Sequence, residues 1–296
     1  MNINEIFNCK EITASTLNLY QTKLKILNDY KPIKNLNFLN DIDNIKSKIE
    51  KYKPNTRRTY IISIVSILKC LTASDKKPTK KLKKLFDDYS IIMNDYNSKL
   101  KDQTTITEGT KILKTDEIND IYEEIKQKAI NKGSNRNDYQ DYLILSLYHL
   151  LPPRRNKDYI YMKFINNYDN DLSKDFNYYD GSKFYFNVYK TRGKYQEQII
   201  DVPKELKIIL NNYIKKYKIE NDNFILTDKN NNDLTKNTNS MTGILNRIFK
   251  SKVGSSMLRR SFLTNKYGKS RDELAEDVEA MGTSQGVANN NYIKKT

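Results

Sequence analysis

The sequence predicts a mainly α-helical protein with a small antiparallel β-sheet, an α+β fold in two domains. Apolar residues recur at helical spacing through the first hundred residues and again in the second half, whereas the alternation typical of strands is confined to 184–202. A chain of 296 residues suggests two domains or one large one. The polar stretch 101–110, which contains Gly109 and lacks apolar periodicity, predicts a linker between domains 1–105 and 111–296.

The first domain is predicted to be helical. We expect a helix capped by Ser15, a second apolar pattern over 38–49, a third helix opened by Asn55, and a further basic helix. The third helix has one apolar face, formed by Ile61, Ile64, Val65, Leu68 and Leu71. Its first turn carries Arg57 and Arg58, although cations at a helix N-terminus oppose the helix dipole. We therefore predict that both arginines contact DNA phosphates, with solvated surface charge as the alternative.

The second domain is predicted to combine helices with one hairpin. Thr115 is placed to cap the first helix, and a longer buried helix runs from about Asp138 to Leu151. Alternation over 184–190 and 195–202, with the turn TRGK between them, predicts the hairpin. A helix then begins at Pro203, and the part beyond the polar loop at 230–233 is helical again.

The charge of the chain points to a polyanionic partner. Lys and Arg total 52 against 36 acidic residues, a formal net charge of +16. A basic protein gains affinity for nucleic acid because neutralised phosphates release their condensed counterions. A skewed genome is the alternative explanation, since Asn, Lys, Ile and Tyr are all abundant. Charge therefore predicts a nucleic acid as the partner without specifying the chemistry.

Other features narrow the class of protein. Cys9 and Cys70 cannot make a disulfide framework, and the single histidine cannot make a zinc site with them, so we expect no metal. No Gly-rich Walker loop is present, and we expect no cofactor. The N-terminus lacks a signal-peptide pattern, and the longest apolar runs, 60–68 and 142–151, are too short to span a bilayer. We expect a soluble, intracellular protein without a membrane partner.

Four residues of the second domain occur in an order that suggests a catalytic site. They are Arg155 in LLPPRRNKDY, Lys190 before the hairpin turn, Arg259 in SSMLRRSFLT, and Tyr292 in MGTSQGVANNNYIKK. In this order the sequence resembles the tyrosine recombinases, the integrase family of phages, mobile elements and large DNA viruses. The resemblance covers 111–296 and, more weakly, the helix NTRRTYIISIVSILKCL, which looks like the family's core-binding helix. It implies a DNA-clamping first domain and a catalytic second domain.

The resemblance implies a role for each residue. In the family, the first arginine has an acidic residue three positions later, and Asp158 stands at that spacing from Arg155 but not from Arg154. Arg155 and Arg259 would bind the phosphate, and Tyr292 would attack it to leave a 3′-phosphotyrosyl intermediate. Lys190 would protonate the departing 5′ oxygen, with Lys194 as a rival. Two further arginines, Arg154 and Arg260, are expected to contact DNA.

The sequence departs from the family at two catalytic positions. Ser256 stands where the family's His-x-x-Arg motif has its histidine, and Thr283 stands nine residues before Tyr292, where the family has histidine or tryptophan. Neither hydroxyl can shuttle protons as an imidazole does, so we expect slower or context-dependent cleavage.

The resemblance also implies partners and leaves alternatives open. It implies a site-specific recombinase or integrase that self-associates on DNA as a dimer or tetramer, acting in the host nucleus or cytoplasm. A viral or mobile-element origin is suspected. A type IB topoisomerase and a noncatalytic DNA-binding relative of recombinases remain the alternatives.

Overall fold

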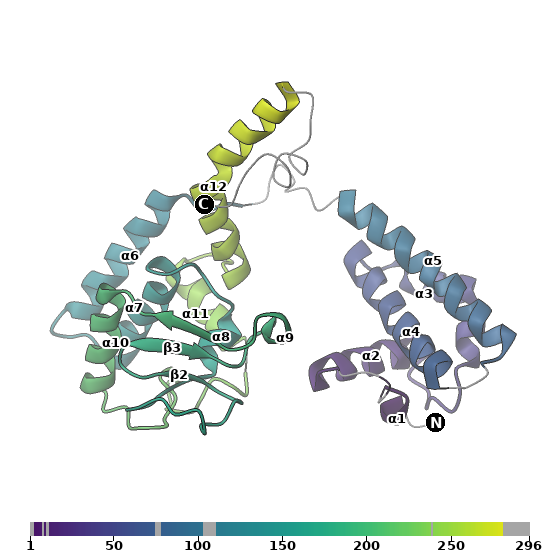
Figure 1. Cartoon of the computed structure of the whole chain (residues 1–296), viewed down its shortest axis with the longest axis horizontal. Coiled ribbons are helices and arrows are strands. Elements are labelled where there is room, and N and C mark those ends of the chain that lie inside the picture. Colours follow the sequence, from purple (N-terminus) through teal and green to yellow (C-terminus); the bar gives the residue numbers. More distant parts are fainter. Residues whose placement is uncertain are drawn as a thin grey trace. The chain divides into compact units, whose positions relative to one another are not determined.

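The structure is a computed structural model that describes residues 3–7, 9, 12–74, 78–102, 111–237 and 239–280. The chain divides into two compact units, Met1–Thr110 (unit 1) and Lys111–Thr296 (unit 2) (Figure 1). Helices dominate both units, and a four-stranded sheet lies in unit 2, which confirms the predicted mainly helical α+β class. No helix within the described ranges is long and apolar enough to cross a membrane.

The described part of unit 1 is wholly helical. Its elements are α1 (Ile3–Phe7), α2 (Ala14–Leu27), the 3-10 helix η1 (Asn37–Asn40), α3 (Ile42–Glu50), α4 (Pro54–Ser74) and α5 (Lys80–Asp102). The cap of α2 is Thr13 rather than the expected Ser15, because the backbone of Thr13 is extended and its hydroxyl accepts from the N–H of Thr16. Helix α5 continues into the stretch predicted as linker and reaches Asp102.

The core of unit 1 is built around α4. Ile61, Ile64 and Leu68 are fully buried, as the apolar face of this helix predicts. Helix α5 packs along α4. One disulfide joins Cys9 to Cys70, with 5.4 Å between their Cα atoms. The expectation that two cysteines build no framework did not foresee this single bond, which ties the segment after α1 to the C-terminal part of α4.

Unit 2 contains seven helices and four strands in its described part. They are α6 (Thr115–Ile130), α7 (Arg136–His149), α8 (Asn156–Ile160), β1 (Met162–Phe164), β2 (Asn177–Tyr179), β3 (Lys183–Phe186), α9 (Arg192–Tyr195), β4 (Gln198–Asp201), α10 (Lys204–Lys216), α11 (Ser240–Ile248) and α12 (Ser255–Ala280), with α9 a single turn.

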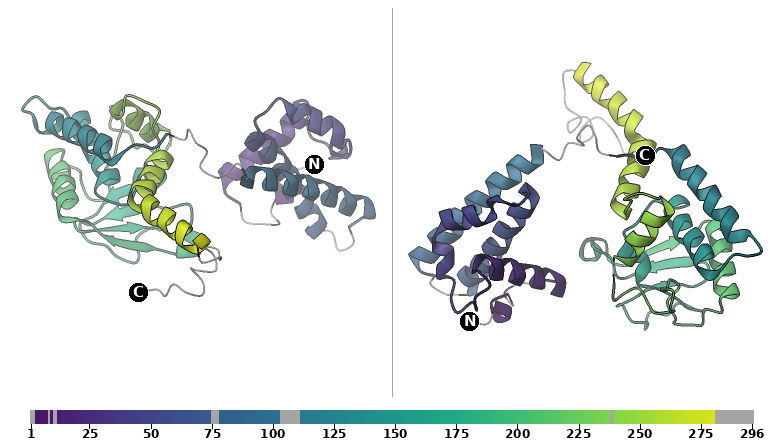
Figure 2. Two further views of the ribbon diagram at one scale, coloured as in Figure 1. Left: turned by 90° about the horizontal axis from the view of Figure 1, so that it is seen from above. Right: turned by 180° about the vertical axis from the view of Figure 1, so that it is seen from behind.

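Two helix starts in unit 2 differ from expectation. Thr115 is already helical and makes no capping bond, since Lys114 occupies the cap position. Helix α7 begins at Arg136, where Asn135 and Asp138 form a capping box. Helix α12 runs without interruption from Ser255, just before the LRRSF motif, to Ala280, and its last turns extend beyond the body of unit 2 (Figures 1 and 2).

The sheet is mixed rather than antiparallel. Its order is β1-β2-β3-β4, and β1 pairs parallel to β2, whereas the other neighbours are antiparallel. The long segment between β1 and β2 makes the parallel pairing possible. The hairpin exists, but its first strand ends at Phe186 instead of residue 190. The side-chain oxygen of Asn177 accepts from the N–H groups of Asn187 and Val188, which takes these two residues out of the ladder.

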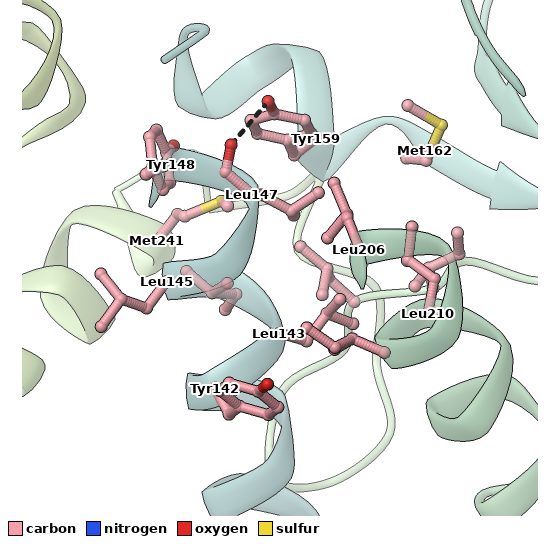
Figure 3. Packing of buried hydrophobic residues seen from close by; sticks show 14 of the residues in the cluster. Tyr142, Leu143, Leu145, Leu147, Tyr148, Tyr159, Met162, Leu206, Leu210 and Met241 are labelled. Atoms are coloured by element: carbon pink, nitrogen blue, oxygen red, sulfur yellow. Dashed lines mark hydrogen bonds between the residues drawn. The ribbon is translucent and has the colours of Figure 1, made fainter. Parts of the chain in front are cut away.

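Helix α7 is the central element of unit 2. Every residue from Gln140 to Tyr148 is buried, because α6, α10 and α11 all pack against this helix. Leucines of α7 contact Leu206 and Leu210 of α10, and Tyr159 of α8 donates to the carbonyl of Leu147 (Figure 3). The C-terminal end of α7 is therefore fixed where the chain enters the segment that carries Arg154 and Arg155.

Candidate active site

Arg154 and Arg155 lie between α7 and α8. Arg155 is the N-cap residue of α8, with an extended backbone, and is half-buried. The sequence-based pairing of Arg155 with Asp158 is wrong: Nε of Arg154 donates to Oδ2 of Asp158 at 2.9 Å. Because α8 begins only at Asn156, Asp158 bonds Arg154, four positions earlier, and not Arg155, three positions earlier.

Arg154 is held on every side. Its Nη1 donates to Oε1 of Gln198 on β4 at 2.9 Å, and its guanidinium lies 3.8 Å from the ring centre of Phe186. Only 17% of its side chain is exposed. These contacts tie α8 to the sheet and give Arg154 a positioning role, while DNA contact by Arg154 stays a prediction.

Asp158 is the electrostatic centre of this region. Burial raises the pKa of its carboxyl, while the charges of Arg154, Arg155 and Arg259 oppose that rise. Its Oδ1 is buried and has no hydrogen-bond partner among the described residues. A buried carboxylate left half-satisfied is costly, and nearby cations reduce that cost.

Arg259 reaches the same region from α12. It is half-buried, and its pKa is lowered first by burial and then by the charges of Arg155 and Arg154, against the effect of Asp158. The two arginines predicted to bind the phosphate, Arg155 and Arg259, come from segments about a hundred residues apart, and the charge of each acts on the other. We call Arg154, Arg155, Asp158 and Arg259 the arginine cluster. Repelling cations gathered around one carboxylate favour an anionic ligand.

Lys190 lies in the connection between β3 and β4 and is exposed. It follows Tyr189, whose ring centre is 5.3 Å from the guanidinium of Arg154 and whose hydroxyl donates to the carbonyl of Gln196. The predicted turn position is wrong, because the connection spans 187–197 and includes α9. Lys194, the rival, is exposed in α9.

The LRRSF motif forms the beginning of α12. Ser256 and Arg260 are exposed, whereas Leu258 is buried. Ser261 is also buried, and its hydroxyl accepts from the N–H of Leu113 at 2.9 Å, which fixes α12 to the segment before α6. Tyr292 and Thr283 lie outside the described residues.

The two arginines predicted to bind DNA in unit 1 have structural partners. Arg57 donates to the carbonyls of Glu50 and Tyr52 at the end of α3, and Arg58 donates to the side chain of Asn97 on α5. Carbonyls at a helix C-terminus attract cations, which explains an arginine that opposes the dipole of its own helix. DNA contact by Arg57 and Arg58 stays a prediction.

Sequence reasoning missed the supporting residues Gln198, Phe186 and Tyr189. All three lie on or beside the hairpin strands, and nothing in local spacing links them to Arg154. No group of three or more His, Cys, Asp or Glu side chains arranged to hold a metal occurs within the described ranges.

Comparison with known proteins gives a distant structural likeness. The chain is similar to a solved structure described as "Crystal structure of XerA recombinase", with a TM-score of 0.37 and 15% identity, over 89% of this chain and 83% of that one. No protein-family model matches the chain, and neither does any curated protein. At this similarity the likeness assigns neither an activity nor a site residue to the chain.

Proposed function

We propose that the protein is a tyrosine-type site-specific DNA recombinase, with unit 2 as its catalytic domain and unit 1 as a DNA-clamping domain. The observation that carries the proposal is the arginine cluster, in which the charges of Arg155 and Arg259 act on each other and on the buried carboxylate of Asp158. Arg155 and Arg259 are also the two arginines that the resemblance implies at the phosphate. The net charge of +16 supports double-stranded DNA as the substrate.

The arginine cluster suits stabilisation of a phosphodiester in transit. Arg155 and Arg259 would each donate hydrogen bonds to the nonbridging oxygens, whose negative charge grows as the nucleophile attacks. Arg154 and Asp158 would hold the segment that carries Arg155. Because Asp158 is ion-paired with Arg154, Arg155 would stay available to the phosphate.

Tyr292 would attack in line and form a 3′-phosphotyrosyl bond, releasing a 5′ hydroxyl. Forming a phenolate at pH 7 costs about 4 kcal/mol from a reference pKa near 10, and guanidinium groups bound to the same phosphate would lower this cost. Lys190 would protonate the departing oxygen, and Ser256 and Thr283 would donate hydrogen bonds in place of the family's imidazole or indole. Slower or context-dependent cleavage follows from these two positions.

The proposal includes the partners expected from the sequence. Protomers would associate on DNA as a dimer or tetramer, and Arg260, which is exposed on α12, would contact the duplex. The protein would act as an integrase in the nucleus or cytoplasm of a host.

A covalent-trapping assay tests this function. The protein is incubated with a suicide substrate nicked near the cleavage site and with supercoiled plasmid, and the adduct is mapped by mass spectrometry. We expect a covalent adduct on Tyr292 that Tyr292→Phe abolishes. Tyr267→Phe is the matched control, because Tyr267 is an exposed tyrosine on α12 and should leave the adduct unchanged.

The same assay separates the alternatives. An adduct with plasmid relaxation but no joined products from two sites would identify a type IB topoisomerase activity. If neither the wild type nor Tyr292→Phe forms an adduct while both bind DNA, the protein is a noncatalytic relative, for which Ser256 and Thr283 are the supporting observation.

A further inference from the structure

A polar cavity of about 460 Å³ lies at the N-terminal end of α7. The beginning of α7, the end of α10 and the segment 219–233 form its walls. Helix α7 has 14 residues and is therefore about 21 Å long. Because Arg155 follows the opposite end of α7, the cavity is separate from the arginine cluster.

The wall beside α7 is rigid. Thr227 lines the cavity, and buried Gln140 holds its backbone through two hydrogen bonds, from Nε2 to the carbonyl at 2.8 Å and from the Thr227 N–H to Oε1 at 3.1 Å. Tyr213 donates to the same Oε1 at 2.9 Å. The hydroxyl of Thr227 is buried without a hydrogen-bond partner among the described residues. A cavity with a fixed wall is organised before any ligand arrives.

The polar loop that the sequence placed at 230–233 forms a second wall. Oδ1 of Asp228 accepts from the N–H groups of Asn230 and Asn232, each at 2.8 Å, which closes the loop on itself. Between them, Asn231 adopts a left-handed conformation with φ 62°. Its side-chain oxygen accepts from Nη1 of Arg136, so the loop presents a residue that orients the guanidinium.

Two cations line the cavity, and neither is ion-paired within the described part of the chain. The guanidinium of Arg136 lies 5.6 Å from the ring centre of Tyr217. Lys218 is exposed and has φ 49°, a conformation that costs a lysine about 1 kcal/mol. The acidic residue Asp233 already accepts from the N–H of Thr235 at 2.9 Å. The lining therefore carries an excess of one positive charge.

We propose that this cavity binds a phosphate group. An arginine held by an aromatic ring and an amide keeps its remaining N–H groups in a fixed fork, which suits a tetrahedral anion better than a flexible cation does. Lys218 supplies a second charge at the rim, where backbone strain is retained. The phosphate belongs either to a free nucleotide or to a DNA backbone. Phosphate binding in this cavity requires no strand cleavage.

Titration calorimetry tests the proposal on the full chain carrying Arg155→Ala and Arg259→Ala, so that phosphate binding at the arginine cluster does not contribute. Inorganic phosphate and dAMP are the free probes, and a 20-base-pair duplex is the polymeric one. We expect phosphate binding that Lys218→Asn weakens about tenfold, because one charged hydrogen bond is lost. Asparagine tolerates the left-handed backbone, which limits effects on folding.

Lys250→Asn is the matched control. Lys250 has φ 48°, is exposed and lies outside the cavity, so its loss should not change phosphate affinity. Asn231→Gly keeps the left-handed backbone and removes the amide oxygen that accepts from Arg136, and it should also weaken binding. A loss limited to phosphate and dAMP identifies a free nucleotide, and a parallel loss of duplex affinity identifies the DNA backbone. Absence of phosphate binding, or equal binding by Lys218→Asn and Lys250→Asn, would overturn the proposal.

Discussion

Adjacent arginines have different surroundings in the arginine cluster. Arg154 is enclosed by Asp158, Gln198 and Phe186, whereas Arg155 caps α8 without a side-chain capping bond. Removing Arg154 would leave a buried carboxylate without its ion-pair partner, and removing Arg155 would not. Loss of Arg154 should therefore lower stability, whereas loss of Arg155 should lower activity.

The first prediction compares the two truncations. Arg154→Ala should lower the free energy of unfolding by about 3 kcal/mol, because Asp158 loses its partner. Arg155→Ala should cost less than about 1 kcal/mol but reduce adduct formation about a hundredfold, with DNA affinity largely retained. Urea unfolding, adduct yield and DNA binding measure the three quantities. The reverse pattern, with Arg155→Ala the destabilised variant, would contradict this division of roles.

The second prediction concerns the pH dependence that Asp158 contributes. Burial raises the pKa of this carboxyl in the folded protein, so the folded state binds more protons than the unfolded state above pH 3.8, the reference value for aspartate. Stability from this group is then complete at low pH and is lost as pH rises toward the folded pKa. The difference in unfolding free energy between wild type and Asp158→Asn should become less favourable to wild type as pH increases from 4. A difference that grows with pH would contradict the raised pKa.

At the scale of elements, the connection between β3 and β4 stores strain beside Lys190. Gln196 has φ 57° and ψ −151°, a region that glycine adopts and that costs other residues about 1–3 kcal/mol. The hydrogen bond from the Tyr189 hydroxyl to its carbonyl, at 2.6 Å, helps to keep this conformation. Tyr189 also contacts Arg154, so the strained residue and the arginine cluster share a neighbour.

The third prediction follows from that backbone. Gln196→Gly should raise the free energy of unfolding by about 1 kcal/mol, because relief of strain exceeds the extra flexibility of glycine in the unfolded chain. Gln127→Gly, at an exposed position inside α6, should lower it by about 1 kcal/mol. Chemical denaturation measures both changes, and a destabilised Gln196→Gly would show that the glutamine side chain supports the loop.

Sequence periodicity predicted the elements whose faces are continuous. The buried face of α4 is an example, since Ile61, Ile64 and Leu68 repeat at helical spacing and are buried as expected. The hairpin was found but its end was not, because that end depends on Asn177, a residue ten positions away on another strand. Likewise, the partner of Asp158 depends on where α8 begins. Local sequence patterns predict helices and strands with a periodic apolar face. Strand ends and side-chain pairs depend instead on contacts between elements that are distant in the sequence.

At the scale of the whole molecule, each unit has its own hydrophobic core. The buried cluster around α4 contains only residues of unit 1, and the cluster around α7 contains only residues of unit 2. The disulfide joins Cys9 and Cys70, 61 residues apart, and both belong to unit 1. A covalent link of this kind stabilises the unit that contains it and should leave a separately folded unit unaffected.

The fourth prediction is that unfolding occurs in two transitions and that reduction shifts only one of them. Closing a loop of this length should stabilise unit 1 by about 2–4 kcal/mol, mainly by restricting the unfolded chain. Calorimetry with and without reductant should therefore show the unit 1 transition moving to lower temperature while the unit 2 transition stays in place. Cys9→Ser should have the lowered unit 1 transition under both conditions, because it has no bond left to reduce. If reductant lowers both transitions equally, the two cores do not unfold independently.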